Sequence, residues 1–192
     1  MENVFENELI KDEKILWTGK PNPEILFTSA DIFLVPFSLM WGGFALFWEA
    51  SVLGIGFLSE KSSSTPFIPF ALFGIPFVLI GLYFIFGRFF YKKWKKGNMY
   101  YAVTNKRILI ITQTMNKNIQ AEYIDRIPAI NYSQNKNGTG TIKFGNANFM
   151  MGMYDNTGLD FFSSFYGKAT PTFFDIDKSK EVYDLVNKLR NE

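Results

Sequence analysis

The feature that most constrains the fold is a run without any charged side chain, FIPFALFGIPFVLIGLYFIFG at 67–87. At about 1.5 Å of rise per residue, a helix of this length crosses the roughly 30 Å hydrocarbon core of a bilayer. A second uncharged run covers 32–48, and its apolar character resumes after Glu49 and continues to Leu58. The sequence therefore predicts a hairpin of two transmembrane helices, with spans at about 32–58 and 67–87. The alternative, two buried helices of a soluble protein, would need more chain than remains to cover both.

The segments flanking the spans predict the orientation. RFFYKKWKKG at 88–97 follows the second span directly, and cytoplasmic flanks of membrane helices are enriched in lysine and arginine. The connection at 59–66 is short, so both termini are expected on the cytoplasmic side. The first apolar run begins after about thirty residues of mixed charge, without the pattern of a cleaved signal peptide. Residues 1–31 are therefore expected to be an N-terminal cytoplasmic segment.

The basic cluster allows three interpretations. It can be a plain topology anchor, since Tyr91 and Trp94 suit the headgroup level of a bilayer. It can also attract anionic lipid, at about 1 kcal/mol per basic residue near the surface. Nucleic-acid binding is rejected, because the formal net charge of the whole chain is only +2. The candidate lipid contacts in this cluster are Arg88, Lys92, Lys93, Lys95 and Lys96.

Glu49 is the acidic residue within the first apolar stretch. An acid in a span is a candidate ion or proton site, but this one is expected near the outer end, where its carboxylate reaches water. Small residues recur at helical spacing on the same face and permit close approach of a second helix. That face carries Ser38, Gly42, Ala45 and Glu49, and Gly74 and Gly81 are expected to face it from the second span.

After residue 98 the pattern changes to short β-rich runs separated by polar turns. The last run is followed by a helix, in which Val182, Leu185, Val186 and Leu189 recur at i, i+3, i+4 and i+7. Asp177 or Ser179 is a candidate cap for this helix. The expected fold of 98–192 is a β-barrel or sandwich with a C-terminal helix across one open end. The expected strands are 99–103, 107–112, 119–127, 129–135, 140–145 and 172–176.

Three motifs carry a resemblance to a known family. The first lies near the N-terminus and consists of Glu13, Ile15, Leu16, Trp17, Gly19 and Pro21. The second, in the first expected strand pair, consists of Tyr101, Thr104, Asn105, Arg107 and Ile108, and the third, in a later strand, of Gly138, Gly140, Ile142 and Phe144. These motifs resemble those of the bacterial pleckstrin-homology-like (bPH) membrane protein family. The resemblance implies a mainly-β domain of the pleckstrin-homology (PH) type, tethered to the bacterial cytoplasmic (inner) membrane by two spans, without enzymatic activity.

The segment 146–172 is longer than the resemblance leads us to expect, and it is rich in aromatic and methionine side chains. Such side chains either fill the core of the domain or form an exposed contact site. The candidate partner-binding residues are Phe161, Phe162, Phe165 and Tyr166.

The chain has no histidine and no cysteine. This removes imidazole bases, thiol nucleophiles and the usual zinc, haem and iron–sulfur ligands. No nucleophile–base set is recognisable, and Asp175 and Asp177 are expected to face solvent or to cap the last helix. We therefore expect no enzymatic activity, no cofactor and no metal.

Three functions remain. The leading one is protein interaction or assembly at the cytoplasmic membrane, through self-association or a protein partner. The second is sensing of anionic lipid, for which Lys106 and Arg107 at the first hairpin of 98–192 are further candidates. The third is a small transporter or channel component centred on Glu49.

Overall fold

The computed structural model describes residues 4–24, 27–58, 67–135, 138–146, 154–159 and 169–192. The chain forms two compact units, which we describe separately. The helical unit is Phe27–Tyr91, and the β unit combines Met1–Leu26 with Lys92–Glu192.

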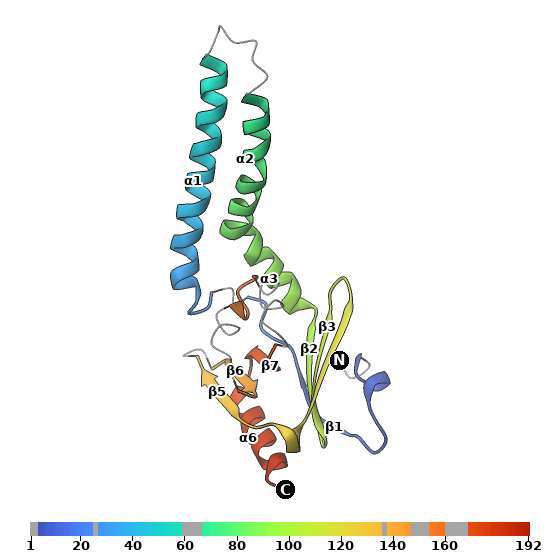
Figure 1. Cartoon of the computed structure of the whole chain (residues 1–192). Coiled ribbons are helices and arrows are strands. Elements are labelled where there is room, and N and C mark those ends of the chain that lie inside the picture. The colour runs from blue at the N-terminus through green and yellow to red at the C-terminus, as the bar shows by residue number, and fades with distance from the viewer. Residues whose placement is uncertain (1–3, 25–26, 59–66, 136–137, 147–153, 160–168) are drawn as a thin grey trace. The chain divides into compact units, whose positions relative to one another are not determined.

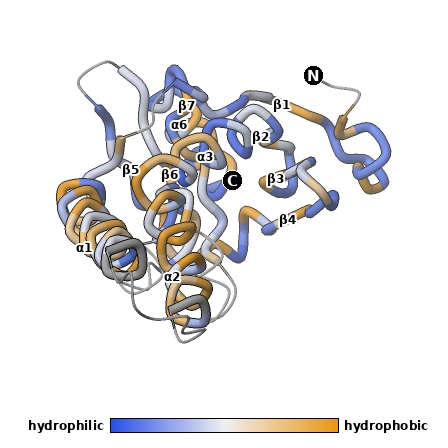
Figure 2. Tube along the Cα trace, turned by 90° about the horizontal axis from the view of Figure 1, so that it is seen from above, coloured by the Kyte–Doolittle hydropathy of each residue, from blue (hydrophilic) through white to orange (hydrophobic). Residues whose placement is uncertain are grey.

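The helical unit contains two long apolar helices, α1 (Asp31–Leu58) and α2 (Phe67–Leu82), which run side by side (Figure 1). Apolar residues lie along both helices (Figure 2). Among the described residues, two stretches are long and apolar enough to cross a membrane, Asp31–Gly54 and Pro69–Gly97. The predicted pair of long apolar helices is therefore confirmed.

The two helices approach closely where both carry glycine. A Cβ atom added to Gly81 would lie 2.8 Å from the Cα atom of Gly42, and one added to Gly74 would meet the carboxylate of Glu49. Ser38 and Ala45, on the same face of α1, are buried. The predicted small-residue face is therefore the contact face between the two helices.

The second helix continues beyond the predicted end of the span at residue 87. A π-helical segment η3 (Tyr83–Gly87) follows α2, and α3 (Arg88–Gly97) follows η3 without a break. Hydropathy marks where apolar residues end, but lysine and arginine are good helix formers, so the helix persists through them. The basic cluster is therefore helical.

The β unit has two antiparallel sheets. The first has the order β1-β2-β3-β4 and the second the order β5-β6-β7. All six strands expected from the sequence are present, and a further strand, β1, precedes the helical unit. The bounds are β1 Ile15–Gly19, β2 Met99–Thr104, β3 Arg107–Gln113, β4 Lys117–Tyr123, β5 Ile130–Gln134, β6 Gly140–Phe144 and β7 Thr172–Ile176.

Strand β1 makes the N-terminal residues part of the β unit. It pairs antiparallel with β2, with Thr18 opposite Ala102. The helical unit is thus inserted between two neighbouring strands of one sheet. From the sequence we expect residues 1–31 and 98–192 to form separate segments. Hydropathy locates apolar runs but carries no information on strand pairing, so it could not reveal that β1 pairs with β2.

One core joins both sheets and the C-terminal helix α6 (Ser179–Arg190). Alternate residues of a strand share a face, and Tyr101 and Val103 of β2 face Phe144 and Phe173 of the second sheet across this core. From α6, Val182 and Val186 are buried against the same core, which confirms the predicted amphipathic helix.

The opposite face of the first sheet is covered by the N-terminal residues. Phe5, just before the short 3₁₀ turn η2 (Glu6–Glu8), is wholly buried against Ala102, Leu109 and Ile111. The first sheet is therefore apolar on both faces near its centre, as the unbroken run ILII in β3 requires.

Candidate functional site

The five basic residues of α3 fall into a buried group and a more exposed group, because they lie on different sides of the helix. Arg88, Lys92 and Lys96 lie four residues apart, so they share one side of α3, and each is at most 2 % exposed. Lys93 is exposed and Lys95 partly exposed. The prediction that all five contact lipid needs correction for the three buried residues, because a charge run in the sequence does not show which side of a helix faces protein.

The buried end of α3 is paired with the last strand of the β unit. The Nζ atom of Lys96 donates to Oδ2 of Asp175 at 2.6 Å, and to the backbone oxygen of Asn22 at 3.3 Å. Asp175 is 4 % exposed. The expectation that Asp175 faces solvent or caps a helix is therefore wrong; it is the buried counter-ion of Lys96.

Asp175 sits at a β-bulge. Gly140 is opposite Ile176 and Ile142 is opposite Phe173, so β7 has two residues where β6 has one. Asp175 adopts a φ of 47°, in the left-handed region that non-glycine residues rarely enter. The bulge interrupts the regular alternation of side chains between the two faces of β7, and the Asp175 carboxylate accepts a hydrogen bond from Lys96 of α3.

Several segments of the β unit meet at Asp175. The Nδ2 atom of Asn156 donates to the same Oδ2 atom at 2.8 Å, and the backbone N–H of Asn22 donates to the Asp175 carbonyl at 2.9 Å. The backbone N–H of Asp175 donates to Oγ1 of Thr141 at 3.4 Å. We call Asp175, Lys96, Asn156, Asn22 and Thr141 the Asp175 network.

The network adjoins a buried tyrosine. Burial raises the pKa of Tyr101, whose hydroxyl accepts a hydrogen bond from the backbone N–H of Phe174, and the charge of Asp175 adds to this rise. Tyr101 therefore stays a neutral phenol.

Arg88 has a separate partner within the helical unit. Its guanidinium Nη1 pairs with Asp31, the first residue of α1, and its Nε donates to the carbonyl of Phe84 at 2.8 Å. Asp31 also accepts hydrogen bonds from the backbone and hydroxyl of Thr28. This buried pair joins the start of α1 to the start of α3.

The other candidate lipid contacts, Lys106 and Arg107, bind the N-terminal residues. Arg107 forms a bidentate salt bridge with Glu13, with Nε–Oε1 and Nη2–Oε2 distances of 2.9 Å. Its Nη2 also donates to the carbonyl of Glu8, and Lys106 donates through Nζ to the carbonyl of Lys11 at 2.7 Å. Both side chains are thus bound to N-terminal residues within the chain, and contact of these partly exposed residues with lipid stays a prediction.

Glu13 is the centre of this second cluster, which we call the Glu13 clamp: Glu13, Thr104 and Arg107. The hydroxyl of Thr104 donates to Oε1 at 2.7 Å and the backbone N–H of Ile10 donates to Oε2 at 2.8 Å. Burial raises the pKa of Glu13, but the hydrogen bonds from Arg107, Ile10 and Thr104 outweigh it and hold the pKa below its usual value. The N-terminal motif, through Glu13, and the motif of the first strand pair, through Thr104 and Arg107, are thus in direct contact.

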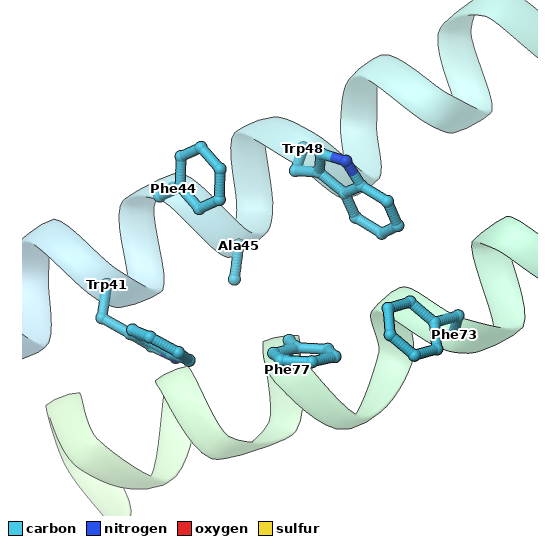
Figure 3. A pocket seen from close by; sticks show the side chains of 6 residues that line it. All are labelled: Trp41, Phe44, Ala45, Trp48, Phe73 and Phe77. Atoms are coloured by element: carbon cyan, nitrogen blue, oxygen red, sulfur yellow. The ribbon is translucent and has the colours of Figure 1, made fainter.

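The helical unit has an aromatic groove of about 210 Å³ beside the contact face of α1 and α2. Side chains from both helices converge on it (Figure 3). Its lining is apolar, without a charged residue: Trp41, Phe44, Ala45, Trp48, Phe73 and Phe77.

Glu49 is only partly exposed, and its Oε2 atom is buried against Gly74. Among the residues that the structure describes, this oxygen has no hydrogen-bond partner. The expectation of a carboxylate that reaches water therefore holds for only part of the side chain.

The remaining predicted site lies outside the described residues. Phe161, Phe162, Phe165 and Tyr166 fall within 160–168. Of the 146–172 segment, the structure describes 146, 154–159 and 169–172, including Asn156 of the Asp175 network and Asp155, which lies 3.7 Å from Nζ of Lys143.

Within the described ranges, no group of three or more acidic side chains has the arrangement of a metal site. The buried charges are instead paired across distant parts of the chain. Sequence reasoning missed the pairs Glu13–Arg107 and Lys96–Asp175, since each joins residues more than seventy positions apart. One sequence signal could have indicated part of this: Arg88, Lys92 and Lys96 are spaced four residues apart, which places them on one side of a helix.

Comparisons of this chain with models of protein families, with curated proteins and with solved structures find no match.

Proposed function

We propose that this chain is a non-enzymatic, membrane-anchored module whose PH-like domain binds an extended polypeptide strand at the cytoplasmic face of a bacterial membrane. Two apolar helices of sufficient length support the anchor. Two antiparallel sheets that share a core with a C-terminal helix are compatible with the PH-like assignment. The insertion of the helices between β1 and β2 supports the sidedness, since paired strands must lie on one side of the membrane.

The observation that carries the binding role is the outer edge of β4. In the described residues β4 pairs with β3 alone, so its other edge presents unpaired backbone N–H and C=O groups. Natural edge strands usually carry charge, proline or a covering element. This strand has two charged residues, Lys117 at its start and Glu122 near its end, and Lys117 is paired with Glu8 at 2.6 Å. It contains no proline.

The side chains on one face of β4 are also available. Ile119, Ala121 and Tyr123 share the face on which Leu109 and Ile111 of β3 are buried. Ile119 is 38 % exposed and Tyr123 40 % exposed. An added strand would gain backbone hydrogen bonds from the edge and apolar contacts from this face, which is the mode of β-strand addition.

Anionic-lipid sensing has less support than strand binding. Of its seven candidate residues, Arg88, Lys92 and Lys96 are buried, while Lys106 and Arg107 bind the N-terminal residues. Lys93 is exposed and Lys95 partly exposed, and two basic residues near an anionic surface give at most about 2 kcal/mol of attraction. That amount suits an orientation signal better than headgroup recognition.

A transport role would centre on Glu49, whose buried Oε2 atom is the observation in its favour. The close contact of Gly42 with Gly81 argues against a path between the helices at that level. A flux assay in liposomes tests the transport role. If the wild type and Glu49→Gln show equal background leak, the transport role is wrong.

The anchor is tested with brominated lipids that quench tryptophan fluorescence at known depths. Trp41 lies ten residues into α1, about 15 Å from its start. In variants of the full chain that retain one tryptophan, Trp41 should be quenched most by bromine near the bilayer centre, and Trp17 of β1 should not be quenched. Equal, weak quenching of both would contradict the membrane span.

The strand-binding role is tested with the full chain in lipid nanodiscs, using peptides selected from a random phage-displayed library as the probe. Selected peptides should lose binding in Ile119→Lys and Tyr123→Lys. They should keep it in Leu16→Lys, a matched change at an exposed apolar residue of β1, the strand at the opposite edge of the same sheet.

A second arm asks whether the strand comes from another copy of the chain. The chain has no cysteine, so Ala121→Cys provides a single site for oxidation. A disulfide-linked dimer that Tyr123→Lys suppresses indicates self-pairing; peptide binding without such a dimer indicates a separate partner. If neither arm shows binding that depends on β4, the proposed role is wrong.

A further inference from the structure

The Asp175 network joins three segments that are far apart in sequence. These are the end of α3 through Lys96, the residues that follow β1 through Asn22, and the turn at 154–159 through Asn156. All three contact one residue of β7, Asp175. A displacement of any of them therefore alters a contact of Asp175.

The contacts are mutually dependent because they share an atom. Lys96 and Asn156 both donate to Oδ2 of Asp175, and this carboxylate is 4 % exposed. If Lys96 withdraws, a buried carboxylate loses its cation, which is strongly unfavourable. Asp175 must then move toward water, and the hydrogen bond from Asn156 cannot remain as it is.

The backbone of Asp175 favours such a move. A non-glycine residue at a φ of 47° is strained, and strain of this kind persists only while the surroundings hold it in place. The surroundings here are the network itself, together with the bulge against Thr141. Loss of Lys96 removes one of these restraints, the cation paired with the carboxylate, and so favours relaxation of the bulge.

We infer that Asp175 is a conformational coupling residue that links the position of the end of α3 to the conformation of the 154–159 turn and of the residues after β1. α3 continues the second apolar helix through η3. In the membrane-anchored chain, a premise that rests on the proposed function, a shift of that helix would thus reach the turn at 154–159. By reciprocity, a ligand that moves the turn would shift the helix end.

The first arm of the test runs from the turn to the helix. A spin label at Lys93→Cys, on the exposed side of α3, reports its mobility in the full chain in nanodiscs, where no native cysteine competes. Asn156→Ala should raise the label's mobility. The matched control is Asn135→Ala, which removes a turn asparagine bonded to Thr139 and should leave the label unchanged.

The second arm runs from the helix to the turn. Lys96→Met should raise hydrogen exchange at 20–24 and at 154–159 by at least about tenfold, which corresponds to 1.4 kcal/mol, while β2 and β3 stay protected. If Lys96→Met unfolds the whole β unit, the double variant Lys96→Met with Asp175→Asn is used instead, because it removes both buried charges and still allows the coupling to be tested. That double variant should be folded, and Asn156→Ala added to it should no longer affect the label.

The coupling is refuted if Asn156→Ala changes exchange only within its own turn and leaves the label at position 93 as mobile as before. It is also refuted if the helix-end variants alter α3 alone. Both readouts are independent of strand binding at β4 and of bilayer quenching, so failure here is distinguishable from failure of the proposed function.

Discussion

Lys96 and Asp175, 79 positions apart, form an ion pair in which Nζ lies 2.6 Å from Oδ2 and both side chains are almost wholly buried. A buried pair gives no assurance of net stabilisation, because two charges must leave water to form it. We expect its effect to be on specificity, because a lone buried charge is costly and the pairing therefore favours structures in which the end of α3 meets the bulge of β7.

A double-mutant cycle measures this dependence. Lys96→Met and Asp175→Asn alone should each destabilise the β unit by about 3–5 kcal/mol, since each leaves one buried group without its partner. The double variant should cost clearly less than the sum. Urea unfolding of the full chain in detergent micelles, followed by circular dichroism, gives the three values. Additive losses would show that the pair is not energetically coupled.

The Glu13 clamp predicts an acid-sensitive component of stability. The folded pKa of Glu13 lies below its ordinary value of 4.5, so the unfolded state binds the proton more readily. This contribution is fully present above about pH 4.5 and is lost as pH falls through the lower folded pKa. Glu13→Gln should lower the free energy of unfolding at pH 7 by about 2 kcal/mol.

The comparison of urea midpoints between pH 7 and pH 3 checks this prediction. The difference between wild type and Glu13→Gln should shrink toward the acid end of the range, because protonation removes the carboxylate that the substitution removes. A difference that stays constant with pH would mean that Glu13 acts through packing rather than charge.

Two glycines of the helical unit should respond to alanine with opposite sign. At Gly81 the added Cβ would lie 2.8 Å from the backbone of Gly42, so the helices must separate and the variant should be less stable. At Gly43 nothing lies within 4 Å of the added Cβ. Gly43→Ala should therefore stabilise by up to about 1 kcal/mol through helix propensity.

Thermal unfolding in detergent, read from helical circular dichroism, distinguishes the two glycine variants. The Tm of Gly81→Ala should fall below that of the wild type while the Tm of Gly43→Ala is equal or higher. Equal effects of the two substitutions would argue that α1 and α2 do not pack through glycine.

Removal of the helical unit should leave a domain that folds. A chain in which a glycine–serine linker replaces 27–91 keeps β1, Phe5 and Glu13 with the β unit. It should unfold cooperatively, whereas residues 98–192 alone should not, because they lack β1 and the cover of the first sheet. Cooperative unfolding of the 98–192 fragment would contradict the division into units described above.

Much of the local structure could be predicted from the sequence. The uncharged runs gave both long helices, and alternation and turn residues gave β2 to β7 close to their observed bounds. Both signals are local, since hydropathy and periodicity are properties of neighbouring residues. Strand β1 was missed, because a five-residue strand whose partner lies across the helical unit has no local signature.

The candidate site was predicted less well. Five basic residues in α3 look equivalent in the sequence, yet burial separates Arg88, Lys92 and Lys96 from Lys93 and Lys95. Helical spacing already placed the three on one side, but their partners could not be read from it. Asp31 and Asp175 lie 57 and 79 positions from their arginine and lysine.

The sequence by itself thus determined which segments are apolar helices and which are strands, because those choices follow from neighbours along the chain. Only the tertiary structure decided that the helical unit is inserted into a sheet, that Arg107 binds Glu13, and that Asp175 is buried. A charge is stable in a protein interior only beside a partner. Which partner it finds depends on strand register and helix packing between residues far apart in the chain.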